Sequence, residues 1–229
     1  MSSPVILALD TKEAEQARNW IRIARPTISH FKIGLEFYLL NGKKSVAALQ
    51  EEFDFELFLD LKLYDIPNTV KGAVESVASL KPKFLTVHAA GGAKMITAAA
   101  QSLPGGSIAA VTVLTSFNDG DFKALGYLED IPQTAKRWAE QAIAAGASSL
   151  ICSPFEAATM KALAPNTTII TPGVRSLGES LDDQNRVMTP KEALDNGADY
   201  VVIGRSITSC ANISDQAMQD KITEIHQSI

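Results

Sequence analysis

Four charged side chains stand near the ends of the first three short apolar segments of the chain. Asp10 closes VILALD, Lys32 lies in HFKIG, and Asp60 and Lys62 lie in ELFLDLKL. Because side chains alternate between the two faces of a strand, Asp60 and Lys62 share one face and the neighbouring leucines share the other. Two carboxylates and two ammonium groups brought together could stabilise developing charge and transfer a proton.

A structural ion-pair network is the alternative interpretation of these charges, since such networks also occupy partly buried places. Removing four charges from water costs several kcal/mol per ion unless the geometry is very good. We therefore favour a functional site.

Two glycine-arginine turns in the last third of the chain indicate anion binding. PGVR ends at Arg175 after the seventh apolar segment, and Gly204 and Arg205 follow the eighth. Glycine lets the backbone approach a ligand closely, and arginine supplies a forked, permanently charged partner. One such turn would be weak support, but two after consecutive predicted strands favour a phosphorylated substrate.

Eight apolar segments alternate with longer amphipathic, alanine-rich segments, and this order predicts the fold. The expected strands cover residues 5–10, 30–34, 56–63, 84–90, 107–114, 149–153, 168–174 and 200–204. Strands that alternate with helices pair in parallel through right-handed crossovers. Eight such units in 229 residues fit an α/β protein with a (β/α)₈ TIM barrel. A doubly wound open sheet is the alternative. Because no linker or change of composition divides the chain, we expect a single barrel domain over residues 1–229.

In a barrel the four charges would meet at one rim, where the C-terminal ends of the strands carry the chemistry of barrel enzymes. Asp65 lies beyond the third strand and an odd number of residues from Lys62. Its spacing by itself predicts only a cap for a helix that begins near Pro67. His88, at the end of the fourth strand, fits either a hydrogen-bonded rim histidine or a catalytic one.

The net charge, the apolar runs and the cysteines of the chain indicate which partners and which cellular location to expect. The formal net charge is −5, and no apolar run approaches the roughly 18 residues that a membrane span requires. We therefore expect neither nucleic acid nor a membrane as a partner. The first residues resemble a strand rather than a signal peptide. Cys152 and Cys210 show no metal-ligand spacing, so two free thiols and a cytoplasmic location are expected.

The segment FLDLKLYDIPNT (58–69) resembles the DxKxxDIPNT signature of the orotidine 5′-phosphate decarboxylase family. The resemblance extends over the whole chain through LALD (7–10), FKIG (31–34), TVHAAGG (86–92), VTVLTS (111–116), PGVR (172–175), QNRVMTP (184–190) and VIGRSIT (202–208). The DxKxxD core alone is shared with magnesium-dependent sugar-phosphate decarboxylases and aldolase-like synthases of the same superfamily. Lys32 and the QNRVMTP stretch distinguish the families, since those relatives typically carry an acidic residue at the position of Lys32 and use magnesium.

The resemblance implies a homodimeric enzyme of pyrimidine biosynthesis that converts orotidine 5′-phosphate to uridine 5′-phosphate (UMP) without cofactor or metal. It implies that Asp10 and Lys32 hold the ribose and order the charges, and that Asp60 faces the substrate carboxylate. Lys62 would stabilise a carbanion at C6 and protonate it. Asp65, counted with Lys32, Asp60 and Lys62 as catalytic, would cross the dimer interface to complete the neighbour's site.

The resemblance also assigns the remaining contacts with the substrate. Thr69 would reach the ribose of the neighbouring subunit beside Asp65, and Thr115 would meet the pyrimidine. Gln184 would bridge base and phosphate, and Gly204 with Arg205 would hold the phosphate. Arg175 resembles the substrate-binding residue that flanks this phosphate loop. Ser206 stands where many members carry a proline, and this departure bears on phosphate affinity because proline would stiffen the loop.

Two other functions stay open at this point. The first is a magnesium-dependent sugar-phosphate decarboxylase or aldolase, against which Lys32 argues. The second is a catalytically silent phosphate-binding barrel that acts as a ligand sensor. The intact set of Lys32, Asp60 and Lys62 argues against the second function.

Overall fold

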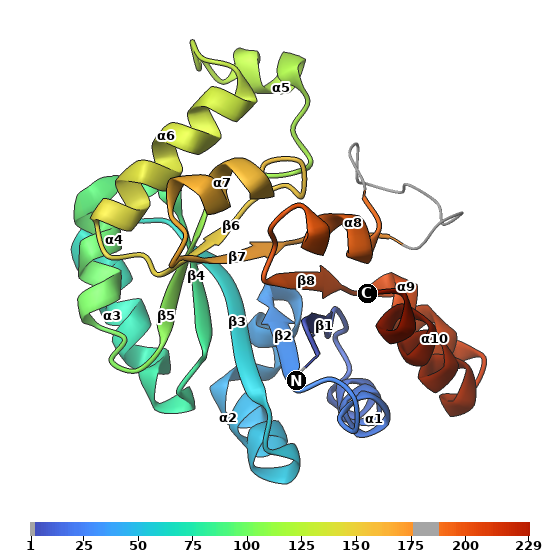
Figure 1. Cartoon of the computed structure of the whole chain (residues 1–229). Coiled ribbons are helices and arrows are strands. Elements are labelled where there is room, and N and C mark those ends of the chain that lie inside the picture. The colour runs from blue at the N-terminus through green and yellow to red at the C-terminus, as the bar shows by residue number, and fades with distance from the viewer. Residues whose placement is uncertain (1–2, 176–187) are drawn as a thin grey trace.

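A computed structural model describes residues 3–175 and 188–229 of the protein. Within them, eight parallel strands form a closed barrel in chain order, and β8 pairs with β1 (Figure 1). The strands are β1 (Val5–Ala8), β2 (His30–Gly34), β3 (Glu56–Leu63), β4 (Phe84–His88), β5 (Ser107–Val111), β6 (Ser149–Ile151), β7 (Thr168–Thr171) and β8 (Tyr200–Ile203). The predicted (β/α)₈ barrel is confirmed, and the open sheet is wrong.

Helices surround the barrel and connect its strands (Figure 1). They are α1 (Ala14–Ala24), α2 (Leu35–Phe53), α3 (Pro67–Val77), η1 (Ala78–Leu80), η2 (Ala89–Gly91), α4 (Gly92–Gln101), α5 (Asp119–Ala124), α6 (Ile131–Ala144), α7 (Ala157–Leu163), α8 (Pro190–Asp195), α9 (Arg205–Thr208), η3 (Ser209–Asn212) and α10 (Asp215–Ser228). In the part of the chain that the structure describes, no helix is both long and apolar enough to cross a membrane.

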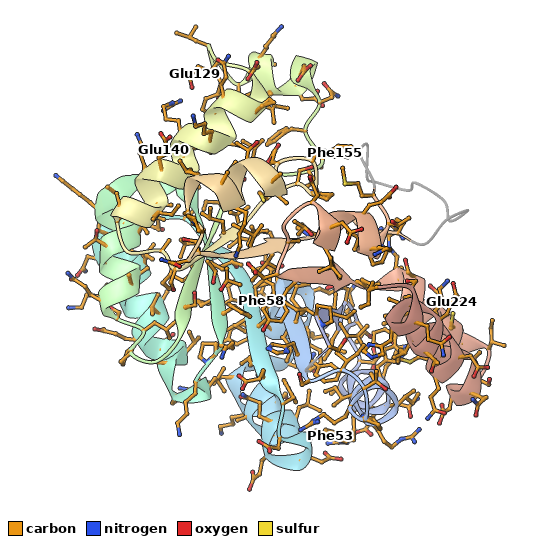
Figure 2. All side chains as sticks on the ribbon, in the orientation of Figure 1. Phe53, Phe58, Glu129, Glu140, Phe155 and Glu224 are labelled. Atoms are coloured by element: carbon orange, nitrogen blue, oxygen red, sulfur yellow. The ribbon has the colours of Figure 1, made fainter. Side chains whose placement is uncertain are left out.

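The hydrophobic core has two parts, as the alternation of strand side chains requires. The larger part lies between strands and helices and includes Leu57 and Leu59. The smaller part fills the barrel and consists of Ile6, Ala8, Phe58, Phe84, Ala109, Val111, Ile151, Ile170 and Val202. Phe58 lies near the centre of the molecule, whereas Glu140 and Glu224 lie on outer helices (Figure 2). The predicted separation of leucines from inner-face residues in β3 is confirmed.

Strand β3 is irregular at its C-terminal end, which its alternating sequence did not predict. Its register against β4 shifts between Leu59 and Leu63, and Lys62 has a φ of 46°. A left-handed conformation costs a residue with a side chain on the order of 1 kcal/mol, so surrounding contacts must hold it. The N–H of Lys62 donates to the Thr86 hydroxyl on β4 at 2.8 Å.

Two glycines set the entry into β6 and β8. Gly146 follows α6 with a φ of 102°, and Gly197 follows α8 with a φ of 101°. A β-carbon is disfavoured in this conformation, so glycine is the residue that ends each helix and turns the chain back to the barrel. Both units thus have the same order of helix, glycine and strand, which delivers their strand ends to the same rim.

Candidate active site

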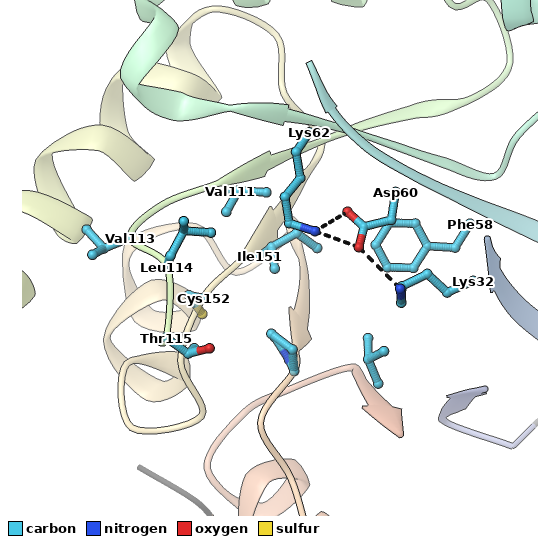
Figure 3. Close-up of a pocket in the computed structure, with 12 residues that line it drawn as sticks. Lys32, Phe58, Asp60, Lys62, Val111, Val113, Leu114, Thr115, Ile151 and Cys152 are labelled. Carbon is cyan, nitrogen blue, oxygen red and sulfur yellow. Dashed lines mark hydrogen bonds and ion pairs between the residues drawn. The ribbon is translucent and has the colours of Figure 1, made fainter. Parts of the chain in front are cut away.

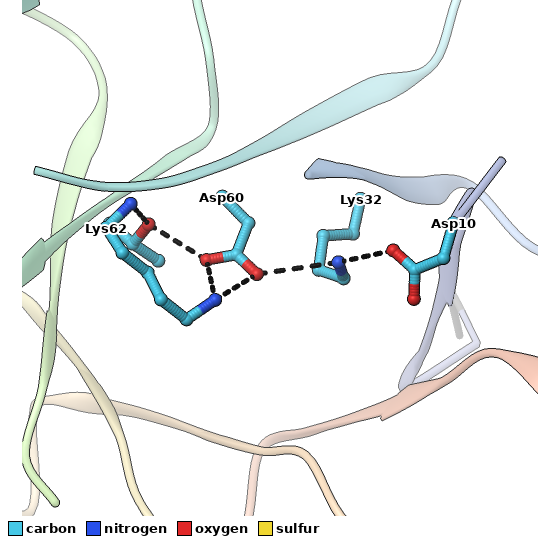
Figure 4. Close-up of polar contacts among 5 residues, drawn as sticks. Asp10, Lys32, Asp60 and Lys62 are labelled. Atoms are coloured by element: carbon cyan, nitrogen blue, oxygen red, sulfur yellow. Dashed lines mark hydrogen bonds and ion pairs between the residues drawn. The ribbon is translucent and has the colours of Figure 1, made fainter. Parts of the chain in front are cut away.

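The four charged residues predicted from the first strands form a continuous series of contacts at the rim (Figure 4). Lys32 Nζ donates to Asp10 Oδ1 at 3.0 Å and lies 3.4 Å from Asp60 Oδ2. Lys62 Nζ lies 2.7 Å from both carboxylate oxygens of Asp60. The side chains therefore meet as the sequence predicted, with charges alternating in sign from β1 to β3, while their roles stay predictions.

Burial and mutual pairing set the ionisation of the central pair. The side chains of Lys32 and Asp60 are 11% and 9% exposed. Burial alone would lower the pKa of Lys32, but Asp60 and Asp10 raise the pKa above its ordinary value. Burial alone would raise the pKa of Asp60, but Lys32 and Lys62 bring that pKa below its usual range. Both groups are therefore charged near neutral pH.

Thr86 joins the charge array from the neighbouring strand, β4. Its hydroxyl donates to Asp60 Oδ1 at 2.9 Å and accepts the N–H of Lys62, and its side chain is fully buried. Sequence reasoning missed this residue. The available signal was its place between Phe84 and His88, on the inner face of the strand that pairs with β3.

A cavity of about 200 Å³ adjoins the array on the side of β5 and β6 (Figure 3). Its wall is mostly apolar, with Lys32, Asp60 and Lys62 at one side and Thr115 and Cys152 at another. The lining residues are Lys32, Phe58, Asp60, Lys62, Val111, Val113, Leu114, Thr115, Ile151, Cys152, Pro172 and Val202. Such a wall suits a flat ring whose reacting atom faces the charges.

A second cavity of about 210 Å³ lies on the side of β1, β7 and β8 and shares Lys32 and Asp60 with the first. Its lining includes the predicted anion-binding residues Arg175, Gly204 and Arg205. The complete lining is Ala8, Asp10, Lys32, Asp60, Pro172, Gly173, Val174, Arg175, Val202, Gly204, Arg205 and Ser206. Together the cavities match a ligand with a ring at one end and an anionic group at the other.

Two predicted residues, Asp65 and Thr69, lie away from the two cavities. Asp65 and Thr69 are exposed and are not among the described residues that line either cavity. Asp65 Oδ1 accepts the N–H of Ile66 at 2.6 Å, and Ile66 itself is the N-cap of α3. The prediction from spacing that Asp65 caps this helix is therefore wrong, although the helix does begin at Pro67. Gln184 lies outside the described residues.

Two further titratable side chains lie beside the array. His88 is half-buried, and its ring centroid lies 5.8 Å from that of Tyr64. Burial, followed by the charge of Lys62, lowers the pKa of His88, so the ring is neutral near neutral pH. Burial raises the pKa of the Cys152 thiol, so this wall of the cavity carries a neutral thiol rather than a nucleophilic thiolate.

Metal-ligating side chains do not cluster within residues 3–175 and 188–229. No group of three or more His, Cys, Asp or Glu residues there could hold a metal ion. The carboxylate that the array holds most tightly, Asp60, contacts Lys32 and Lys62.

Several known proteins resemble this chain over most of its length. The model of the Orotidine 5'-phosphate decarboxylase / HUMPS family matches residues 3–219. An orotidine 5'-phosphate decarboxylase of Thermobifida fusca is 49% identical, with 91% of this chain and 90% of the relative covered. An orotidine 5'-phosphate decarboxylase of Frankia casuarinae is 42% identical, with 90% of this chain and 82% of the relative covered. The crystal structure of orotidine 5'-phosphate decarboxylase from Lactobacillus acidophilus is 29% identical, with a TM-score of 0.83 and coverage of 97% and 98%. The chain therefore belongs to the Orotidine 5'-phosphate decarboxylase / HUMPS family.

Proposed function

We propose that this protein decarboxylates orotidine 5′-phosphate to UMP in pyrimidine biosynthesis, without a cofactor or metal. The observation that carries the proposal is the series Asp10, Lys32, Asp60 and Lys62, set between an apolar cavity and one lined by two arginines. The relatives at 49% and 42% identity bear the name of this enzyme. The reaction takes place within one barrel domain that comprises residues 1–229, in the cytoplasm.

The substrate spans both cavities. The pyrimidine occupies the apolar cavity beside Thr115, and the phosphate lies against Gly204 and the guanidinium groups of Arg175 and Arg205. Lys32 lines both cavities and donates a hydrogen bond to Asp10, which supports the proposal that these two residues hold the ribose. Gln184 is proposed, from the resemblance alone, to bridge base and phosphate. Contacts with the phosphate supply binding energy remote from the reacting carbon, which can organise the site around the ring.

Loss of CO₂ leaves an electron pair at C6 in an orbital that lies in the plane of the ring and is orthogonal to its π system. Because the ring cannot delocalise this pair, stabilisation must be electrostatic. The ammonium of Lys62 supplies a positive charge at the edge of the apolar cavity, where the pyrimidine ring would lie. The C6–carboxylate bond breaks, its electrons stay on C6, and an Nζ–H of Lys62 then donates a proton to C6.

Asp60 prepares Lys62 for this step. Its two oxygens hold Lys62 Nζ, while Lys32 Nζ contacts the same carboxylate from the other side. Holding the ammonium in advance avoids reorganisation when charge develops at C6. The carboxylate of the substrate would face Asp60, whose negative charge favours departure of CO₂.

The proposal includes a homodimer in which Asp65 and Thr69 serve the neighbouring site. Both side chains are exposed, and Asp65 lies between Tyr64 and Ile66, which are 63% and 67% exposed. Large apolar side chains with this exposure on both sides of a charged residue are typical of an interface. Further exposed apolar side chains occur after β2, at Leu35, Leu39 and Leu40.

Mixed dimers test the role of Asp65. Asp65→Ala and Lys62→Ala proteins, each inactive alone, are mixed under conditions that exchange subunits. In the hybrid, one site combines an intact Lys62 with an intact Asp65 from its neighbour, so part of the activity returns. No recovery despite exchange shown by differently tagged subunits would rule out the contribution across the interface.

The decisive test of the reaction is the ultraviolet absorbance change of orotidine 5′-phosphate on addition of purified protein, with and without a metal chelator. Conversion to UMP at the same rate in both cases supports the proposal. Folded protein that gives no conversion contradicts it. Conversion that the chelator abolishes contradicts metal independence and favours the magnesium-dependent relatives.

A further inference from the structure

We propose that Thr86 is a positioning residue of this site, which fixes the backbone of Lys62 and the carboxylate of Asp60 through a single hydroxyl group. The proposal rests on the proposed function, because its kinetic consequence is read in the decarboxylation. Its geometric basis lies wholly in the described residues of β3 and β4.

The hydroxyl of Thr86 makes two hydrogen bonds of defined direction. It accepts the N–H of Lys62 at 2.8 Å and donates its own hydrogen to Asp60 Oδ1 at 2.9 Å. An ionised carboxylate can only accept and a backbone N–H can only donate, so the direction of both bonds follows. The Thr86 side chain is fully buried, which shields both bonds from water.

The first bond gives the Lys62 N–H a partner where the register between β3 and β4 shifts. The register between β3 and β4 shifts between Leu59 and Leu63, and Lys62 adopts its positive φ within that interval. A backbone N–H left without a partner away from water costs about 1–3 kcal/mol. By accepting this N–H, Thr86 stabilises the irregular conformation from which the Lys62 side chain reaches Asp60.

The second bond, from the Thr86 hydroxyl to Asp60, holds the carboxylate that pairs with the Lys62 ammonium. Asp60 Oδ1 accepts both the Thr86 hydroxyl and Lys62 Nζ. Thr86 therefore restrains the lysine twice, through its backbone and through the carboxylate that binds its ammonium. An ammonium aimed at C6 must be held within about 0.5 Å to be effective, which is the reason that two restraints matter.

The test compares Thr86→Val, which keeps the shape and removes the hydroxyl, with Thr86→Ser, which keeps the hydroxyl. Thr171→Val is the matched control. Thr171 is also fully buried on a strand, and among the described residues its hydroxyl has no hydrogen-bond partner. Circular dichroism and a thermal scan establish that each variant folds. Should Thr86→Val not fold, Thr86→Ala takes its place, since a water can then meet the exposed N–H.

The expected result is a split between turnover and binding. Loss of a hydrogen bond to a charged group should lower kcat in Thr86→Val by roughly tenfold to a hundredfold. UMP affinity should change less than about threefold, while Thr86→Ser should return kcat to within about threefold of the wild type. Loss of the hydroxyl also raises the pKa of Asp60, so the acid limb of the kcat profile should move to higher pH.

Two kinetic results would overturn the proposal. One is a kcat in Thr86→Val equal to that of Thr171→Val. The other is a folded Thr86→Ser as slow as Thr86→Val, because the methyl group rather than the hydroxyl would then be what matters.

A crystal structure of Thr86→Val separates this proposal from the proposed function. If the wild type does not turn over orotidine 5′-phosphate, the proposed function fails and the structure alone decides on Thr86. Displacement of Lys62 Nζ by more than about 0.5 Å, without such movement in Thr171→Val, supports the positioning role. An unmoved Lys62 contradicts it.

Discussion

The interior of the barrel contains an aromatic layer and a charged layer that use the same strands. Toward the N-terminal ends, the rings of His30, Phe84 and Tyr200 cluster together, and His30 lies 6.4 Å from Phe84 and 4.9 Å from Tyr200 between ring centroids. Phe58 packs edge-on against Phe84 at 5.8 Å. Two residues further along β2, β3 and β4 come Lys32, Asp60 and Thr86. The interior thus changes from aromatic to charged within one repeat of the strand.

Buried side chains in the two layers differ in charge although their burial is comparable. His30 is 5% exposed, and burial lowers its pKa more strongly than the opposing effect of Glu56 raises it, so the ring stays neutral. Asp60, taken as a whole residue, is 7% exposed, yet it stays ionised because Lys32 and Lys62 contact it. The partners of a buried group, rather than its depth, decide whether it keeps its charge. We therefore expect the aromatic layer to stabilise the barrel, and we propose that the charged layer serves chemistry.

Lys62→Ala is the strongest test of that division. Removal of both the electrostatic stabiliser and the proton donor should reduce kcat by at least ~10⁴-fold. UMP binding, which depends on the phosphate and ribose contacts, should stay measurable. An absorbance assay of turnover measures kcat, and calorimetric titration measures the affinity for UMP. A variant with a rate near that of the wild type would remove Lys62 from its proposed role.

Phe84→Ala makes the corresponding change in the aromatic layer. Phe84 is 3% exposed and contacts the rings of Phe58, His30 and Tyr200. The resulting cavity should lower the free energy of unfolding by about 3–5 kcal/mol, while kcat per folded molecule stays within about threefold of the wild type. Urea unfolding and active-site titration measure these effects. A large fall in kcat without loss of stability would show that the layers are not separate in function.

Asp60→Asn tests the stability of the charged layer as a function of pH. Folding lowers the pKa of Asp60, so the ionised carboxylate stabilises the folded protein above the unfolded pKa of about 4. This stabilisation is lost as the pH falls through the folded pKa. At pH 7 the variant should be less stable by about 2 kcal/mol, and this difference should shrink below about pH 4. Urea unfolding from pH 7 to pH 3 measures it. A difference that is constant with pH would contradict the assigned ionisation of Asp60.

His30→Phe should have the smallest effect. A histidine whose folded pKa is lowered destabilises the protein as the pH falls below the unfolded pKa of about 6.5, because the unfolded chain binds the proton more readily. Between pH 7 and pH 5 the wild type should therefore lose about 1 kcal/mol more stability than the variant. Urea unfolding at both pH values provides the measurement, and parallel losses would mean that His30 titrates normally in the folded state.

The sequence by itself determined the order of strands, the direction of their side chains and the meeting of Asp10, Lys32, Asp60 and Lys62. These follow from local periodicity, because a strand alternates its faces at every residue. Strands 30–34 and 56–63 match their predicted bounds. The predicted strands 5–10 and 107–114 end earlier, at Ala8 and Val111, because apolar residues continue into the loops after pairing with neighbouring strands has stopped.

Only the tertiary structure decided how the array is held. Thr86 is an ordinary strand residue in the sequence, and its contact with Lys62, 24 positions away, depends on a register shift between β3 and β4. The left-handed conformation of Lys62 could not be foreseen for the same reason, since it is stabilised by β4 rather than by its neighbours. Local patterns specify which face a side chain takes, but contacts between strands decide which atoms meet.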